Sequence, residues 1–451
     1  MSKGRRLILG LGATGLSVAR HLHGRGLPFA VTDSRAEPPN AAALAQLGDV
    51  PKAFGRFASP VPLSGISEAV ASPGISLDEP FIRELREAGI PVVGDLELFA
   101  RARPSSAPVI GITGSNGKST VTTLVGEMAK AAGRKAAVGG NLGPPALDLL
   151  REPAELYVLE LSSFQLELTQ SLACTAAACL NVSPDHIDRH GSLEHYAALK
   201  LSVYRGAKTA IVNADDALSQ PRLAAGAQAK TFRLGPPAGD EYGLIEESGA
   251  RWLCQGREKI LPLAALRIYG LHNAANALAA FALADAIGLP RAASVKALRE
   301  FGGLPHRCQW LAEVAHVNYF NDSKGTNVGA TLAALSGLPM PVVLLAGGQA
   351  KGGDFAPWRP VLKEKGRALV LFGQDAPLIA EAVGDAVPQY RAGSLHEAVQ
   401  QAAAVARPGD AVLLSPGCAS FDMFKGYADR GEQFAAEVAR LSLPLRREAR
   451  A

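Results

Sequence analysis

The chain has 451 residues, of which 48% are hydrophobic and 20% are charged, and its formal net charge is +4. This length predicts two to four domains, with three as the working number. The small charge excludes a general attraction to nucleic acid or membrane surfaces, and no run of about 18 apolar residues could span a bilayer. Five scattered cysteines without CxxC spacing argue against a disulfide framework and a zinc site, and indicate reduced thiols in a cytosolic protein.

Short apolar runs that end in Gly, Asp or Asn alternate with helical patterns, which predicts an α/β protein built on parallel sheets. The runs fall into three groups, and we expect three domains over residues 1–96, 97–303 and 304–451. Between residues 230 and 268, polar and apolar residues alternate around Gly turns. That pattern predicts a small antiparallel sheet in the central domain.

The first motif, LILGLGATGLSVARHL, places Gly10, Gly12 and Gly15 in G-x-G-x-x-G spacing between an apolar strand and a helix. Asp33 ends the next strand, where a dinucleotide-binding fold places its ribose-binding carboxylate. A diphosphate can rest on the N-terminus of such a helix. The motif alone leaves three interpretations open: NAD binding, binding of another nucleotide diphosphate, or a tight structural turn.

The second motif, VIGITGSNGKSTVTTL, is an apolar strand that runs into a phosphate-binding loop and a helix. Backbone amides of such a loop cradle phosphates, its lysine neutralises the β and γ oxygens, and the next hydroxyl ligates Mg²⁺. Ile112 stands where the strict Walker A form has Gly, but the strand, loop and helix context still favours nucleotide binding. The predicted loop residues are Gly114, Ser115, Asn116, Gly117, Lys118, Ser119 and Thr120.

Acidic and histidine residues follow the next strands of the central group. Glu160 lies in the apolar strand of LYVLELSSFQL, and a buried carboxylate there requires a partner such as a cation. The later loop SPDHIDRH crowds His186, Asp188, Arg189 and His190 at the carboxyl edge of the sheet. Zinc is conceivable, but the P-loop in the same domain favours Mg²⁺ bridging phosphates. Solvated loop residues are the alternative for the loop's first aspartate and last histidine.

The stretch GSLEHYAALKLSVYRGAK predicts one amphipathic helix over residues 191–208. Lys200 shares its face with residues that should be buried, namely Leu193, Tyr196, Ala197, Val203 and Tyr204. By itself this pattern favours a lysine that extends its ammonium out to water. The alternative is a chemical role.

In the third group, the loops GLPHR, NDSKGTN and GGQAKGGDF follow glycines or strand ends. They carry Arg307, Asp322, Lys324 and Lys351. Their placement makes these residues candidates for lining a cleft between domains.

In this order, GITGSNGKSTVTTL, YVLELSSFQL, NVSPDHIDRH, AALKLSVY, GLHNAANALAA, GLPHR and NDSKGTN resemble the Mur ligases of peptidoglycan synthesis. The resemblance implies a Rossmann-like UDP-binding domain, a central P-loop domain, and a Rossmann-like third domain that closes over ATP and binds glutamate. GLGATGLS, ASPGI and SPGCASFDMFKGYADRG are similar to members that add glutamate to UDP-N-acetylmuramoyl-L-alanine. ATP phosphorylates the substrate carboxylate in such enzymes, and the glutamate amine attacks the acyl phosphate through a tetrahedral intermediate.

The resemblance also implies a role for each matching residue. Lys118 and two Mg²⁺ ions, with Mn²⁺ as a substitute, would screen the reacting anions. Ser119 and Glu160 would hold one ion, and His186 and a carbamylated Lys200 the other. The UDP-sugar would contact Ala13, Thr14, Asp33, Ser34, Arg35, Gly74, Asn141 and Ser162. ATP would also contact Asn276, Arg307, Asp322 and Lys324, and glutamate would contact Thr326, Lys351, Ser420, Phe421 and Tyr427.

Several alternatives remain beside this hypothesis. An NAD-linked oxidoreductase would use only the first glycine-rich motif, and a nucleotide-binding regulatory or transport protein would need only the P-loop. A folylpolyglutamate synthase shares the general chemistry but is disfavoured by the UDP-type first domain. D-glutamate is favoured over L-glutamate, although no residue decides between them. We expect a cytoplasmic monomer whose partners are small molecules, and whose third domain swings toward the second around FGGLPHR.

Overall fold

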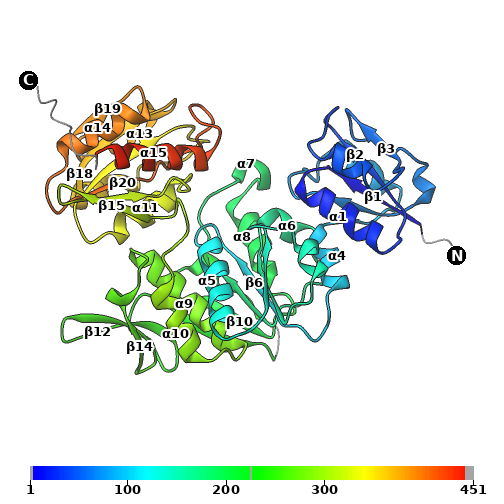
Figure 1. The fold of residues 1–451 in the computed structure, drawn as a ribbon, viewed down its shortest axis with the longest axis horizontal. Coiled ribbons are helices and arrows are strands. Elements are labelled where there is room, and N and C mark those ends of the chain that lie inside the picture. The colour runs from blue at the N-terminus through cyan, green and yellow to red at the C-terminus, as the bar shows by residue number, and fades with distance from the viewer. Residues whose placement is uncertain (1–3, 224–225, 442–451) are drawn as a thin grey trace, which may run out of the picture.

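The computed structural model describes residues 4–223 and 226–441, and its strands form three sheets of five, nine and six strands. The sheets lie in three lobes that follow one another along the chain (Figure 1). Most neighbouring strands are parallel, so the predicted α/β class is confirmed. No helix within the described residues is long and apolar enough to cross a membrane.

The first sheet has the order β3-β2-β1-β4-β5, with β1 at its centre between β2 and β4. The last three residues of β1 and all of β2 are buried, as expected for a parallel sheet covered on both faces. The sequence pattern did not reveal β3, because none of its three residues is fully buried. The elements are β1 Arg5–Leu9, α1 Ala13–Gly24, β2 Phe29–Asp33, α2 Ala41–Ala45, β3 Lys52–Phe54, η1 Leu63–Gly65, β4 Ile66–Ala71, α3 Pro80–Glu87 and β5 Val92–Val93.

The central sheet has the order β14-β13-β12-β11-β10-β9-β6-β8-β7. The predicted antiparallel strands are present, but they extend the parallel sheet, because Phe232 of β11 pairs with Tyr242 of β12. The elements are α4 Asp95–Ala102, β6 Val109–Thr113, α5 Lys118–Ala131, β7 Ala136–Gly140, η2 Ala146–Arg151, β8 Leu156–Glu160, α6 Ser163–Glu167, β9 Ala176–Cys179, α7 Ile187–His190, α8 Leu193–Leu201, η3 Ser202–Tyr204, β10 Thr209–Asn213, η4 Ala217–Ser219, β11 Gln228–Phe232, β12 Tyr242–Glu247, β13 Ala250–Gln255, β14 Glu258–Pro262, η5 Leu263–Ala265, α9 Leu271–Ala286 and α10 Arg291–Glu300.

Two apolar cores cover the two faces of the central sheet. Alternate residues of β8 face opposite sides: Tyr157 and Leu159 pack with α4 and α8, whereas Leu156 and Val158 pack with α5, α9 and α10. This period of two is the expected geometry of a strand between two helical layers. It fixes the carboxyl ends of β6, β8 and β9 at one edge.

The third sheet has the order β15-β16-β20-β17-β18-β19, and only its edge strand β15 is antiparallel among the described pairs. Its central strands β17 and β20 are fully buried. The elements are β15 Gln309–Val314, β16 Val317–Asn321, α11 Val328–Gly337, β17 Val342–Gly347, α12 Trp358–Lys365, β18 Gly366–Phe372, α13 Ala376–Val383, β19 Gln389–Arg391, α14 Leu395–Val405, β20 Ala411–Leu414 and α15 Tyr427–Leu441.

Candidate active site

The phosphate-binding loop joins β6 to α5 at the carboxyl edge of the central sheet. Gly114 and Gly117 have φ angles of 147° and 82°, which favour glycine. A Cβ atom on Gly117 would also overlap the side-chain oxygen of Asn276 from α9. Lys118 begins α5, and its Nζ donates to the carbonyl oxygens of Gly114 (2.7 Å) and Ser115 (2.9 Å). The loop therefore holds its own cation where phosphates would bind.

Glu160 is the centre of a short polar chain beside this loop. Its Oε2 accepts a hydrogen bond from Ser119 Oγ at 2.5 Å, and its Oε1 accepts one from Asn141 Nδ2 at 2.7 Å. Arg307, which comes from the third group, donates from Nη2 to the same Ser119 Oγ at 2.6 Å. The structure thus brings together the predicted metal ligands Ser119 and Glu160, and it adds a cation from the next lobe.

Lys200 is buried, with 1% of its surface exposed. Its Nζ donates to Gly114 O at 2.8 Å and lies 4.4 Å from the centre of the Tyr196 ring. The interpretation of an ammonium that reaches water is therefore wrong, because the side chain points at the back of the phosphate-binding loop. Burial, followed by the nearby charge of Lys118, lowers the pKa of Lys200 to about 7. The predicted helix is interrupted: α8 ends at Leu201 and continues as η3.

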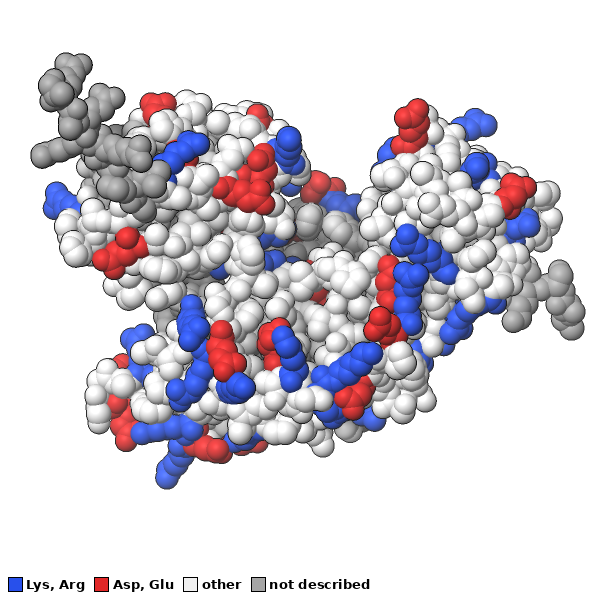
Figure 2. Space-filling model, viewed as in Figure 1, with Lys and Arg blue, Asp and Glu red and all other residues white. Residues whose placement is uncertain are grey.

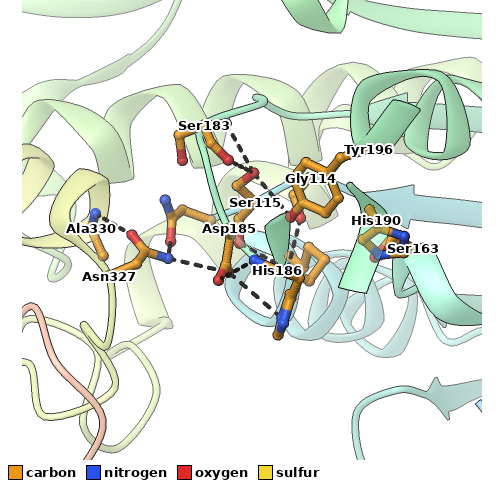
Figure 3. A network of polar contacts seen from close by, with 12 residues as sticks. Gly114, Ser115, Ser163, Ser183, Asp185, His186, His190, Tyr196, Asn327 and Ala330 are labelled. Carbon is orange, nitrogen blue, oxygen red and sulfur yellow. Dashed lines mark hydrogen bonds and ion pairs between the residues drawn. The ribbon is translucent and has the colours of Figure 1, made fainter. Parts of the chain in front are cut away.

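Two serines and a tyrosine connect the phosphate-binding loop to the histidine loop (Figure 3). Ser115 Oγ donates to Ser183 O at 3.0 Å, accepts from Ser183 N at 3.0 Å, and lies 3.2 Å from Tyr196 OH. Asp185 lies near the side-chain amide of Asn327 from the third lobe, at 3.5 Å. These contacts place the histidine loop between the P-loop and the third domain.

The histidines of that loop have different environments. His186 has a φ of 54° and a half-exposed side chain whose Nε2 lies 3.7 Å from Asp185 Oδ2. His190 is 6% exposed, and its Nε2 lies 3.0 Å from Ser163 Oγ. Burial, followed by the charge of Arg189, lowers the pKa of His190 to about 4. The prediction that His190 is a solvated loop residue is therefore wrong. Asp185 is partly solvated, with 30% of its side chain exposed.

A cavity of about 300 Å³ lies between the central and third lobes and is lined by residues of both. Figure 2 shows a separate, wider hollow between the first and third lobes, above the central lobe, with acidic and basic side chains intermingled over the rest of this face. The predicted residues Asn116, Gly117, Thr120, Asn276, Arg307, Asp322 and Lys324 line this cavity. The other polar residues of the lining were not predicted from the sequence, namely Asn181, Ser183, Asn213, Asp216, His272 and Asn273.

The cavity residues of the third lobe have shifted pKa values. Burial raises the pKa of Asp322 to about 7, although its carboxylate accepts hydrogen bonds from Ser415 Oγ and Cys308 N. Burial, followed by the charge of Arg307, lowers the pKa of Lys324 to about 8. The Lys324 Nζ lies 3.7 Å from the centre of the Tyr427 ring, so the aromatic face holds this ammonium.

Four of the predicted glutamate residues are spread over three loops, and the fifth, Tyr427, is the first residue of α15. Gln349 and Ala419 exchange backbone hydrogen bonds of 2.9 Å, which brings the loop of Lys351 beside that of Ser420. Ser420 is buried, Lys351 is exposed, and Phe421 is 67% exposed. Thr326 lies on the segment between β16 and α11. The loops of Lys351 and Ser420 therefore lie side by side, whereas Thr326 lies on a separate loop.

Arg430 of α15 is fully buried, and sequence reasoning missed it. Its guanidinium donates to Ser323 Oγ and Ser323 O at 2.9 Å each and to Cys418 O at 3.2 Å. Ser323 lies between Asp322 and Lys324, so this arginine holds the loop that carries both. The signal was weak, because an arginine in a helical pattern normally indicates a solvated face.

The first glycine-rich turn lies on its own sheet, in the blue lobe of Figure 1. Gly12 precedes α1, and Asp33 Oδ2 accepts a hydrogen bond from Leu11 N at 2.6 Å. Arg35 forms a two-bond ion pair with the same carboxylate, at 2.9 and 2.7 Å. Burial acts to raise the pKa of Asp33, but the hydrogen bonds from Arg35 and Leu11 outweigh it and lower the pKa to about 2. The other predicted residues around this turn, Ala13, Ser34 and Gly74, are exposed, and Thr14 is half-buried.

Ser162 and Asn141 belong to the central lobe, close to Glu160. Ser162 caps α6 in a reciprocal pair with Gln165, and Asn141 follows β7. The eight residues predicted for the UDP-sugar therefore divide between two lobes, so a substrate that contacted all of them would have to span both.

The donor set at the phosphate-binding loop fits a hard cation. The Ser119 hydroxyl and the Glu160 carboxylate are oxygen ligands of the kind that Mg²⁺ prefers. His186 supplies a half-exposed imidazole. Lys200 as an ammonium would repel a metal ion, so it fits this donor set only in a modified, anionic form.

Comparison with known protein families and structures gives consistent matches along the chain. Residues 4–94 match the Mur ligase MurD-like N-terminal domain, residues 112–284 the Mur ligase middle domain, and residues 306–418 the Mur ligase glutamate ligase domain. The chain is 52% identical over 440 residues to the UDP-N-acetylmuramoylalanine–D-glutamate ligase of Nitrosococcus oceani, covering 96% of both chains. It is 50% identical over 442 residues to the ligase of that name from Pseudomonas aeruginosa, covering 97% of this chain and 98% of the relative.

The structural matches support the fold alone. The UDP-N-acetylmuramate-alanine ligase MurC of Thermotoga maritima aligns with a TM-score of 0.60 at 19% identity, over 97% of this chain and 100% of that one. A pseudomurein peptide ligase type C from Methanothermus fervidus aligns with a TM-score of 0.56 at 14% identity, over 97% and 100%.

Proposed function

The chain belongs to the Mur ligase family, and we propose that it joins D-glutamate to UDP-N-acetylmuramoyl-L-alanine with ATP. The single observation that carries the proposal is the convergence of Lys118, Lys200, Arg307 and Lys324 on the carboxyl edge of the central sheet. These cations come from two lobes and influence one another's pKa values. The names of relatives that are about half identical over the whole chain support the choice of substrates.

The charge distribution suits transfer of a phosphoryl group between two anions. The triphosphate and the substrate carboxylate repel each other, and fixed cations in a site with little water lower that repulsion. Attack of the carboxylate oxygen on the γ-phosphorus forms an acyl phosphate and breaks the bond to ADP. The glutamate amine then attacks the acyl carbon, and phosphate and a proton leave as the amide forms.

Ser119, Glu160, His186 and a modified Lys200 are the residues proposed to hold two Mg²⁺ ions, with Mn²⁺ as a substitute. Bound Mg²⁺ would supply additional positive charge to the phosphate oxygens. Within the chain, Asn141 Nδ2 and Ser119 Oγ each donate to one oxygen of Glu160, so both oxygens of the carboxylate are oriented.

Lys200 is proposed to act as a carbamate. Its pKa of about 7 leaves a large neutral fraction at neutral pH, and the neutral amine attacks CO₂ with loss of one proton. The product is an anion that retains one N–H, which can keep the hydrogen bond to Gly114 O. The Tyr196 ring, whose centre lies 4.4 Å from the Lys200 Nζ, covers the position and would limit exchange with water.

Substrate binding is proposed to extend over the three lobes. The diphosphate would lie at the N-terminus of α1, with Asp33 holding Leu11 and Arg35 in place. The muramoyl portion would reach Asn141 and Ser162, and the nucleotide would occupy the 300 Å³ cavity. Glutamate would lie by the loops of Lys351 and Ser420, with Thr326, Phe421 and Tyr427 closing from the third lobe.

The test is release of ADP and phosphate by the full chain with ATP, UDP-N-acetylmuramoyl-L-alanine and glutamate. We expect product release only when both co-substrates are present, and D-glutamate to exceed L-glutamate by at least about 100-fold, as expected for a site that orients several polar groups. Steady-state release of phosphate with either co-substrate alone, or equal rates for the isomers, would contradict the proposal. A single turnover of ADP with the UDP-sugar alone would be the acyl-phosphate step itself. An oxidoreductase would instead consume NAD.

The proposed active form is a cytoplasmic monomer that closes on its ligands. Arg307 connects the third lobe to Ser119, so binding of ATP at this junction should draw the lobes together. Small-angle scattering with and without all ligands, at two protein concentrations, measures both closure and association. Identical profiles would contradict closure, and a mass of two chains would contradict the monomer.

A further inference from the structure

Three potential metal ligands meet where α6, α7 and α8 converge in the central lobe. Glu167 is the last residue of α6, His190 is the last residue of α7, and His195 lies in the first turns of α8. Each offers one ligand atom, and these atoms all lie within 4.8 Å of one another. None of the three belongs to the residues proposed above for Mg²⁺ or ATP.

His190 is a buried imidazole with one nitrogen still to be satisfied. Its Nε2 pairs with Ser163 Oγ at 3.0 Å, and its Nδ1 is buried without a hydrogen-bond partner among the described residues. An unsatisfied buried nitrogen is costly, so it normally has a partner such as a ligand or an ion. Ser163 would orient the ring as outer partners of metal-bound histidines do. The ring also stacks on Phe164, at 5.0 Å between centres, which further fixes its plane.

Glu167 provides the anionic member of the cluster. Arg189 Nη2 holds its Oε2 at 2.8 Å, whereas the contact of Arg189 Nη1 with Oε1 is long, at 3.5 Å. Oε1 therefore keeps lone-pair capacity for a cation. His195 is exposed, so an ion can enter from solvent and its ring can turn toward the other two ligands.

The donor types select the class of ion. Two imidazoles and one carboxylate form a ligand set typical of Zn²⁺ and similar divalent transition metals, whereas Mg²⁺ prefers oxygen ligands alone. We propose that Glu167, His190 and His195 form a binding site for a divalent transition metal of the zinc class, separate from the Mg²⁺ ions of the ligase reaction. A bound ion would connect the ends of three helices beside the histidine loop.

The test is a titration of the metal-free full chain with Co²⁺ in excess Mg²⁺, followed by the visible absorption of the bound cobalt. We expect one saturable equivalent with the bands of nitrogen and oxygen ligands, and their loss when Zn²⁺ is added. Substitutions His195→Gln and Glu167→Gln should each weaken binding at least about tenfold. The control His316→Gln removes an exposed histidine of the third lobe and should leave binding unchanged.

Two results would overturn the site. One is the absence of saturable binding in excess Mg²⁺, and the other is an unchanged affinity in His195→Gln. Because His195 is exposed, this variant should unfold at the temperature of the unmodified chain, which thermal unfolding verifies. The titration needs no substrate, so its outcome does not depend on the proposed ligase function.

Discussion

The two glycine-rich turns of this chain share the local pattern of a strand, a turn and a helix. They differ in the groups that surround the glycines. In the first turn, a Cβ atom on Gly15 would overlap the carbonyl oxygen of Gly10, so glycine lets the turn pack on itself. In the P-loop, a Cβ atom on Gly117 would overlap Asn276 from a distant helix. Gly15 therefore allows close packing within the first turn, whereas Gly117 leaves room for the Asn276 side chain of α9.

The charges differ in the same way. The carboxylate at the first turn, Asp33, is already satisfied by Leu11 N and Arg35. At the P-loop, Lys118 and Lys200 both donate to Gly114 O, and Arg307 reaches Ser119. Binding at the first turn should therefore depend mainly on backbone groups, and reaction at the P-loop on side-chain charges.

The strongest test of this comparison is Lys118→Ala. It removes the cation closest to the loop carbonyls, so we expect the rate of ADP release to fall by at least about 10³-fold, or about 4 kcal/mol of activation free energy. The matched control is Lys130→Ala on the same helix, where the lysine is exposed. If Lys118→Ala lowered the rate of ADP release by less than tenfold, backbone amides would be sufficient for phosphate binding at both turns.

Lys200→Ala tests the buried amine behind the loop, and we expect a loss of about 10²- to 10³-fold in the same assay. The control Lys208→Ala changes an exposed lysine just after η3. For the unmodified enzyme depleted of CO₂, recovery on adding bicarbonate should increase as pH rises from 6 to 8, because a pKa of about 7 makes the reactive neutral amine more abundant. Recovery that is independent of pH, or no bicarbonate effect, would contradict the carbamate.

Arg307→Lys keeps the charge of the cation that the third lobe supplies but loses the reach of the guanidinium to Ser119. We expect kcat/KM for ATP to decrease about 30-fold, within the range for loss of a charge-assisted hydrogen bond. The control Arg299→Lys lies exposed near the end of α10. Equal values for both variants would show that the interlobe contact does not serve the reaction.

Arg430→Lys asks how far the site depends on support from outside it. A lysine cannot replace all the contacts of this buried guanidinium, so we expect the free energy of unfolding to fall by about 2–4 kcal/mol. Displacement of Ser323 should also lower kcat about tenfold at a temperature where the variant is folded. The control Arg440→Lys is exposed on the same helix. If Arg430→Lys lowered the free energy of unfolding but left kcat unchanged, Arg430 would stabilise the fold without positioning the active-site loop.

Asp33→Asn should have the smallest effect on catalysis, with KM for the UDP-sugar raised about fivefold and kcat unchanged. Because the pKa of Asp33 is lowered to about 2, its ion pair stabilises the fold above about pH 4 and is lost as pH falls toward 2. Asp33→Asn should therefore reduce the loss of stability in acid, measured by denaturant unfolding at pH 3 and pH 7. Asp49→Asn is an exposed control. A loss in kcat comparable to that of Lys118→Ala would break the contrast between the turns.

The α/β class, the phosphate-binding loop and about half of the polar residues that line the cavity could be predicted from the sequence alone. Apolar runs such as VIGIT and YVLEL are buried on both faces, and local patterns of this kind report strands directly. The short strand β3 and the attachment of β12 to β11 were missed, because neither is encoded by a strong local pattern.

The contacts of Lys200, His190 and Arg430 could not be predicted from the sequence and follow from the three-dimensional packing. Each is a polar residue that local rules assign to solvent, and each is buried by elements distant in sequence. Lys200 lies against Gly114, and Arg430 against Ser323 and Cys418. The physical reason is that a buried polar group must find its partners in three dimensions, whereas hydrophobic periodicity records only which side of an element faces inward.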